Sequence, residues 1–224
     1  MAAMRAGVRA IAFDFDGVVV DSMPVHWACW RDALESVFGL QAERHHEAIR
    51  RNLFSGRAGP GMFEGAEILS EAHGALRTHK DTLWLERAPD VPLMPGAGEA
   101  LVALSARYPL AIATTARRTF VDGILSREGL ASVFRVIVTN ADVSRPKPAA
   151  DILLMIAGEF ALPASEIAMV GDTAFDRQMA AAAGSPFLWF ETDPLPRSMD
   201  GGGGGNPVVT DWPALARMLD GARP

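Results

Sequence analysis

Two aspartates, Asp14 and Asp16, interrupt an apolar stretch near the N-terminus and are followed at once by Gly17. The residues that lead to them, 9–14, have the short apolar pattern of a buried strand. Because side chains alternate along a strand, we expect both carboxylates on one side of it. Two carboxylates in a buried place are costly unless a cation accompanies them. The pattern therefore predicts a hard metal ion, with a phosphate beyond it that the backbone at Gly17 can approach closely.

Three later segments also place polar side chains directly after apolar stretches. They contribute Thr114 and Thr115, then Lys147 between two prolines, then Asp172 and Asp176 in a Gly-Asp-x-x-x-Asp pattern. Hydroxyls and an ammonium suit phosphate oxygens, and carboxylates suit a metal ion. In a parallel α/β sheet, ligands bind at the carboxyl ends of the strands. We therefore expect these side chains to meet at one site.

The elements that must position these residues alternate between strand and helix after residue 96. Apolar runs predict strands over residues 109–114, 134–139, 167–171, 186–190 and 207–209. Helical patterns lie between them, over residues 97–107, 117–128, 148–160 and 176–183, and a last one covers residues 212–219. This alternation predicts an α/β fold, a parallel sheet with helices on both faces.

Residues 21–91 interrupt this rhythm, because their pattern is helical throughout. We expect one helix from residue 23 to about Gly39, a short polar one over residues 41–52, and two more over residues 62–73 and 76–87, separated by Gly74. We interpret the block as a cap domain of residues 21–91, inserted into a core domain of residues 1–20 and 92–224. The alternative is a single continuous domain.

The first motif, Asp-x-Asp-Gly-Val-x-x-Asp-Ser from Asp14, resembles that of the haloacid dehalogenase superfamily in its phosphatase and phosphomutase branch. The later motifs occur in the order of that family. The resemblance implies a Rossmann-like, doubly wound parallel sheet with an inserted helical cap. It also implies a Mg²⁺-dependent phosphatase that hydrolyses a small phosphate monoester through an aspartyl-phosphate.

The same resemblance implies a role for each candidate residue. Asp14 is the nucleophile, Asp16 the general acid and base, and Lys147 the cation that neutralises the transferring group. The phosphate oxygens are held by Gly17, Thr114, Thr115 and Lys147. The Mg²⁺ ion is bound by Asp14, Asp172 and the backbone carbonyl of Asp16. Asp176 supports Lys147 or a metal-bound water. The third motif departs from the family pattern, since Arg145 and Pro146 stand where a Gly is often found.

Other activities within the superfamily fit the residues less well. Asp16 argues against a dehalogenase, which lacks the second acid. The cap contains only one lysine, Lys80, and it comes late, which argues against a phosphonoacetaldehyde hydrolase. A sugar phosphomutase that resembles β-phosphoglucomutase remains an alternative, and so does a catalytically silent binding or regulatory protein.

One cap residue, Arg57, lies in a Gly-rich break between two predicted helices. Small residues there would allow a loop to approach the core, where Arg57 would hold a polar or anionic group of the substrate. The alternative is a solvated arginine in a helix–helix loop.

Composition restricts the class of partner. The chain has 224 residues, 49% of them hydrophobic, and a net charge of -6, which predicts a packed core and argues against a nucleic-acid partner. Cys29 is the only cysteine, so no intrachain disulfide is expected. No uncharged apolar run reaches the ~18 residues of a membrane span. Charged residues interrupt the apolar stretch at the N-terminus, so we expect no signal peptide there. We expect a cytoplasmic monomer or homodimer that acts on a small phosphorylated metabolite. We also expect residues 201–205 to form a flexible surface loop.

Overall fold

The computed structural model describes residues 7–55, 57, 59–191 and 206–220. The chain divides into two compact units, which we call the core unit (Met1–Asp21 with Leu93–Pro224) and the helical unit (Ser22–Pro92). The predicted loop at residues 201–205 lies outside the described residues. Within the described part of the chain, no helix is both long and apolar enough to cross a membrane.

The core unit is built on a parallel sheet of six strands in the order β3-β2-β1-β4-β5-β6. The strands are β1 (Ala10–Phe13), β2 (Leu110–Thr114), β3 (Val136–Thr139), β4 (Ile167–Gly171), β5 (Phe187–Phe190) and β6 (Val208–Val209). The central strands are apolar on both faces because helices cover both sides of the sheet. The chain builds outward from β1 to β3 and then returns to β4 beside β1. In doubly wound sheets ligands bind at a reversal of this kind, which lies here at the carboxyl ends of β1 and β4.

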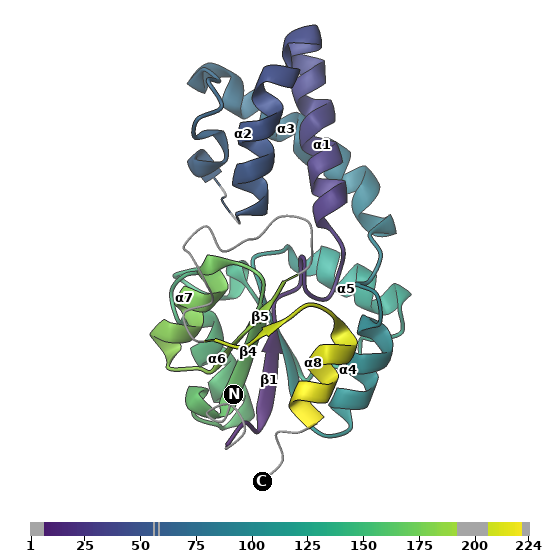
Figure 1. Ribbon diagram of the computed structural model, residues 1–224, viewed down its shortest axis with the longest axis vertical. Helices are drawn as coiled ribbons and strands as arrows, with labels where there is room; N and C mark the ends of the chain where they lie inside the picture. Colours follow the sequence, from purple (N-terminus) through teal and green to yellow (C-terminus); the bar gives the residue numbers. More distant parts are fainter. Residues whose placement is uncertain (1–6, 56, 58, 192–205, 221–224) are drawn as a thin grey trace. The chain divides into compact units, whose positions relative to one another are not determined.

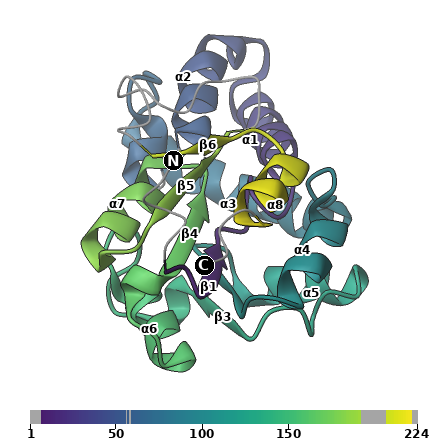
Figure 2. The ribbon, with the colours of Figure 1, turned by 60° about the horizontal axis from the view of Figure 1, so that its bottom comes forward.

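In the described part of the core unit, five helices surround the sheet: α4 (Ala97–Ser105), α5 (Arg118–Arg127), α6 (Asp151–Phe160), α7 (Ala174–Ala183) and α8 (Trp212–Asp220). Helices α6 and α7 lie on one face, where Ile152, Ile156 and Met179 join a core cluster with the strands. Helices α4 and α8 pack together on the other face (Figures 1 and 2). The predicted α/β class, with a Rossmann-like doubly wound sheet, is confirmed.

The helical unit consists of α1 (Met23–Phe38), α2 (Glu43–Phe54) and α3 (Ser70–Arg87), and its described residues contain no strand. It has a hydrophobic core of its own, which includes Trp30, Leu34, Ile49, Phe63 and Leu76. Short 3₁₀ helices complete the chain in both units, at Gly39–Gln41, Gly59–Phe63, Ala88–Asp90, Asn140–Asp142 and Ala164–Glu166.

The prediction of two helices separated by Gly74 was wrong, because α3 runs through Gly74 without a break. Residues 59–63 form a 3₁₀ helix instead of the start of a longer helix. A glycine inside a helix costs only about 1 kcal/mol relative to alanine. Packing of an apolar face, to which the buried Leu76 contributes, supplies more than that.

Candidate active site

Three strand ends bring candidate residues to the carboxyl edge of the sheet, near this reversal. Asp14 directly follows β1, Thr114 is the last residue of β2, and Asp172 directly follows β4. The backbone N–H of Asp14 still donates to the carbonyl of Val170 on β4, at 2.9 Å. The segments that carry Asp14 and Asp172 are therefore joined by the sheet itself.

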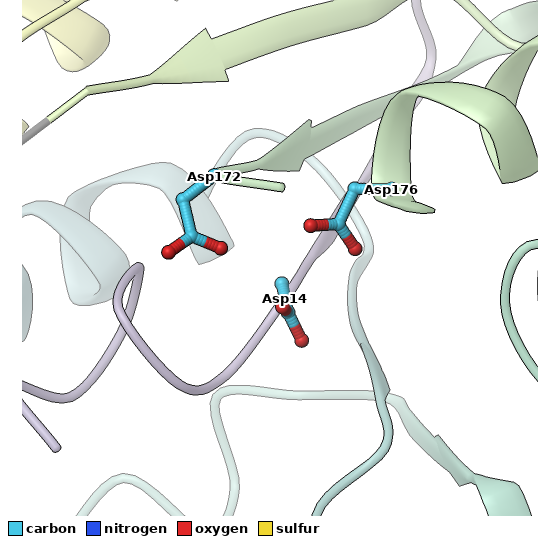
Figure 3. A group of neighbouring side chains, drawn as sticks. All are labelled: Asp14, Asp172 and Asp176. Carbon is cyan, nitrogen blue, oxygen red and sulfur yellow. The ribbon is translucent and has the colours of Figure 1, made fainter. Parts of the chain in front are cut away.

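The carboxylates of Asp14, Asp172 and Asp176 form a buried group, with one oxygen of each within 4.8 Å of the others. Figure 3 shows them converging from the ends of β1 and β4 and from the first turn of α7. Lys147 reaches the same group: its Nζ lies 2.9 Å from Asp14 Oδ1 and 2.5 Å from Asp176 Oδ1. The Lys147 side chain is only 3% exposed, so its ammonium is almost wholly surrounded by protein.

The charges in this group are unbalanced, because three carboxylates face the single ammonium of Lys147. Burial, together with the neighbouring Asp176, raises the pKa of Asp14 from 3.8 to about 7, although Lys147 opposes the shift. Burial alone would lower the pKa of Lys147, but Asp14 and Asp176 outweigh it and raise that pKa. Lys147 therefore stays charged. A compact set of carboxylate oxygens with excess negative charge fits a hard divalent cation such as Mg²⁺.

Asp176 is fixed from two sides at the start of α7. Thr173 caps this helix, and its N–H and hydroxyl donate to Asp176 Oδ2 at 3.0 and 2.5 Å, while the N–H of Asp176 donates back to Thr173 Oγ1 at 3.3 Å. The other carboxylate oxygen, Oδ1, accepts from Lys147. Sequence reasoning singled out Asp176 but missed Thr173, which the Thr-x-x-Asp capping pattern could have revealed.

Gly171 leaves no room for a side chain. A methyl group on its Cα would lie within 3.0 Å of Cβ, Cγ and Oδ2 of Asp176. The glycine therefore permits Asp176 to pack directly against the end of β4. Its place in the motif was visible in the sequence, but the close approach was not.

The chain leaves the strand before Asp16, so the strand alternation does not decide where the Asp16 side chain points. Regular strand structure ends at Phe13, and the chain then turns, with the N–H groups of Val19 and Val20 both donating to the carbonyl of Phe15. Gly17 has a φ of 78°, which suits a glycine. The strand alternation that was expected to align Asp14 with Asp16 therefore stops at Asp14. The carboxylate group accordingly contains Asp176 rather than Asp16.

The remaining candidates lie as follows. Thr114 is buried, and its hydroxyl oxygen accepts the N–H of Ala116 at 3.0 Å, whereas Thr115 is exposed. Arg57 belongs to the helical unit, where its guanidinium pairs with Glu64. The structure therefore brings together Asp14, Lys147, Asp172 and Asp176 by direct contact or proximity, and places Thr114 at the neighbouring strand end.

A doubly wound sheet with a buried carboxylate–lysine cluster at its strand ends defines a class of α/β proteins whose site suits a divalent cation and an anionic group. Residues 8–184 match the family model described as haloacid dehalogenase-like hydrolase, and the chain belongs to this family. Its expected place in the phosphatase-like branch of the family is confirmed by the relatives below.

Relatives of known activity are similar to most of the chain. A phosphoglycolate phosphatase from Yersinia pseudotuberculosis is 30% identical over 196 residues, covering 81% of this chain and 80% of that protein. The fructose-1-phosphate phosphatase YqaB of Escherichia coli is 24% identical over 177 residues, covering 78% and 92%. A subfamily IA hydrolase from Geobacter sulfurreducens has a similar structure, with a TM-score of 0.71, 26% identity and coverage of 96% and 98%.

Proposed function

We propose that this protein is a Mg²⁺-dependent phosphatase that hydrolyses a small phosphate monoester through an aspartyl-phosphate on Asp14. The observation that carries the proposal is the buried contact of Lys147 with Asp14 and Asp176 beside Asp172, at the carboxyl ends of β1 and β4. An ammonium in that position neutralises both the nucleophile and the anionic group that it attacks.

The geometry of Asp14 suits a nucleophile. Its Oδ1 accepts the N–H of Phe15 at 2.7 Å and lies 2.9 Å from Lys147 Nζ, so one oxygen is held in place. The other oxygen, Oδ2, is left for attack on phosphorus. As the Oδ2–P bond forms and the P–O bond to the alcohol breaks, Asp16 donates its proton to the departing oxygen.

The second half of the reaction restores the enzyme. Asp16, now a carboxylate, accepts a proton from water as the water oxygen attacks phosphorus, and the Oδ2–P bond of the aspartyl-phosphate breaks. Inorganic phosphate leaves, and Asp14 is a carboxylate again. Thr114, Thr115, Lys147 and the backbone at Gly17 bind the phosphoryl oxygens in both halves.

The residues that would hold Mg²⁺ are Asp14 and Asp172, with the backbone carbonyl of Asp16. When bound, the ion supplies positive charge that reduces the repulsion between an anionic nucleophile and an anionic phosphate. Asp176 keeps Lys147 in position beside these ligands, since it accepts from Nζ at 2.5 Å.

The relatives support a small substrate, because those named here act on phosphoglycolate and fructose 1-phosphate. We propose a phosphorylated acid or sugar of similar size, with the predicted cap domain of residues 21–91 contributing to substrate selection. A panel of sugar, polyol, acid and nucleotide phosphates would identify the preferred member.

The first test is release of inorganic phosphate by the purified protein with Mg²⁺, from an aryl phosphate and from this panel. Chelation should stop the release, and added Mg²⁺ should restore it. Asp14→Asn should lower turnover by roughly 1,000-fold or more, because it removes the nucleophile. Unchanged turnover after chelation, or in Asp14→Asn, would contradict the proposal, and so would conversion of one sugar phosphate isomer into another without release.

Metal binding can be measured without turnover. Mg²⁺ at about 100 times its Kd should stabilise the folded protein by about 2.7 kcal/mol. Asp172→Asn should lose this stabilisation, whereas Asp122→Asn, which changes an exposed carboxylate on α5, should keep it. Equal stabilisation of both variants would show that the ion does not bind at Asp172.

A further inference from the structure

Trp212, the first residue of α8, contacts the turn that contains Asp16. Its side chain is fully buried, and its Nε1–H donates to the carbonyl of Val18 at 2.9 Å across a separation of 194 residues. Both residues belong to the core unit. A buried carbonyl that loses its donor is costly, so this bond favours one position of the turn.

The indole ring also packs against two phenylalanines of the sheet. Its centroid lies 5.3 Å from that of Phe13, the last residue of β1, and 5.7 Å from that of Phe190 on β5. Trp212 thus holds the segment of residues 13–18 at both ends, by packing on Phe13 and by the hydrogen bond to Val18. Asp14 and Asp16 lie between these two points.

The turn itself is short and tightly bonded. The N–H groups of Val19 and Val20 donate to the carbonyl of Phe15 at 2.9 and 3.0 Å, and the N–H of Gly17 donates to Val20. These bonds keep the turn compact but do not attach it to the rest of the sheet. Attachment comes from distant residues: Trp212 donates to Val18, and the N–H of Met94 donates to the carbonyl of Val19 at 2.9 Å.

Helix α8 is itself anchored at both ends. The carboxylate of Asp211 accepts the N–H of Ala214 at 2.6 Å and so caps the first turn beside Trp212. At the other end, the hydroxyl of Tyr108 donates to the carbonyl of Leu219 at 3.3 Å. The helix therefore gives the indole a fixed base.

We propose that Trp212 is a positioning residue for Asp16, and that α8 thereby takes part in proton transfer to the leaving group. The inference rests on the proposed function, in which Asp16 is the general acid and base. A displacement of about 1 Å in a catalytic group is enough to slow a reaction by about 100-fold. Loss of the Nε1–H donor should therefore affect the steps that depend on Asp16 more than those that do not.

The test compares two tryptophan-to-phenylalanine variants. Trp212→Phe keeps an aromatic ring against Phe13 but removes the donor to Val18. Trp189→Phe is the matched control, because Trp189 is also buried and packs on Phe187 at 5.1 Å, while its Nε1 has no hydrogen-bond partner in the described structure. Both variants replace a buried indole with a smaller aromatic ring, but only Trp212→Phe removes a hydrogen bond.

The kinetic readout is kcat/KM for two substrates with different leaving groups. A nitrophenolate leaves without a proton, whereas an alkoxide from an alkyl phosphate requires one from Asp16. In Trp212→Phe we expect kcat/KM to fall about tenfold or more for the alkyl phosphate and about threefold or less for nitrophenyl phosphate. Trp189→Phe should change both substrates alike. An equal loss for both substrates in Trp212→Phe would overturn the inference.

A second readout does not depend on catalysis. Hydrogen exchange at the amides of residues 17–20 should be faster in Trp212→Phe than in wild type, and unchanged in Trp189→Phe. Unchanged exchange in Trp212→Phe would also overturn the inference. A wild type that hydrolyses neither substrate would instead overturn the proposed function, and with it the role of Asp16, before any variant is compared.

Discussion

At the scale of single residues, the site depends on how closely Asp176 approaches the end of β4. Its carboxylate has no exposed surface, and it links Thr173 to Lys147 through its two oxygens. Lys147 in turn lies 2.9 Å from Asp14. A small displacement of Asp176 therefore reaches the proposed nucleophile through one intermediate side chain.

Gly171→Ala should produce such a displacement. The new methyl group would lie within 3.0 Å of three Asp176 atoms, so the carboxylate must shift. We expect a loss of about 1–3 kcal/mol in the free energy of unfolding and a fall in kcat of roughly 100-fold. Chemical denaturation and steady-state kinetics measure the two effects.

Gly158→Ala is the control for that variant. Gly158 lies inside α6, and a methyl group there meets nothing within 4 Å. The substitution should raise the free energy of unfolding by about 0.5–1 kcal/mol, because alanine favours helix, and it should leave kcat unchanged. A Gly171→Ala variant with wild-type kcat would show that the close approach does not position the site.

At the scale of elements, β3 and β4 of the core unit are each followed by a local hydrogen-bonded cap. Thr173 and Asp176 cap α7 after β4, and Thr139 and Asp142 form the same reciprocal cap after β3. The Asp142 carboxylate accepts from both the N–H and the hydroxyl of Thr139, each at 2.7 Å. Repeated caps of this kind turn the chain sharply at the edge where the site forms.

The cap at Asp142 should make stability depend on pH. The N–H and hydroxyl of Thr139 lower the pKa of Asp142 below 3.8, because they bind its charged form. The ionised carboxylate therefore contributes stability above pH 3.8, and this contribution is lost as the pH falls through the lowered pKa. Asp142→Asn should lower the free energy of unfolding by about 0.5–1 kcal/mol at pH 7. The difference from wild type should shrink below pH 3.8.

Unfolding in urea at several pH values measures this difference. Asp122→Asn is the control, since Asp122 forms an exposed pair with Arg118 on α5, at 2.9 Å. Such pairs contribute about 0.5 kcal/mol or less. A difference between wild type and Asp142→Asn that stays constant from pH 7 to the acid limit would contradict the assigned pKa shift.

At the scale of the whole molecule, the chain is divided between a core unit that contains the catalytic candidates and a helical unit with its own hydrophobic core. We propose that the helical unit selects the substrate, through Arg57. The Arg57 side chain is 42% exposed and pairs with Glu64, which is 64% exposed. Such an exposed pair contributes little to stability, and we expect Arg57 to exchange Glu64 for an anionic group of the substrate.

Arg57→Ala should lower kcat/KM for the preferred substrate, and the loss should correspond to about 1–3 kcal/mol of transition-state binding. The kcat/KM for a small aryl phosphate should change much less. Glu64→Gln is the control, because it removes the same ion pair but keeps the guanidinium. Its kcat/KM should be equal to or higher than that of wild type. Equal losses in the two variants would show that Arg57 acts only through its ion pair.

Much of the fold could be predicted because it follows from local patterns. Apolar runs that alternate with helical ones require a parallel sheet, and the positions of Asp14, Thr114 and Asp172 after those runs place them at one edge of it. The rule that parallel strands present their carboxyl ends together does not depend on side-chain detail. The residues and the order of the motifs resemble those of the family, and that resemblance was sufficient to identify it.

Other features were decided only by tertiary structure. The continuity of α3 through Gly74 depends on packing that outweighs propensity, and the position of Asp16 depends on a turn whose hydrogen bonds replace the strand pattern. The contact of Trp212 with Val18 joins residues 194 positions apart. Sequence spacing specifies which residues share a strand or a helix turn. Only the packing of separate elements determines which distant atoms come within hydrogen-bonding distance, because that depends on the shapes of the side chains between them.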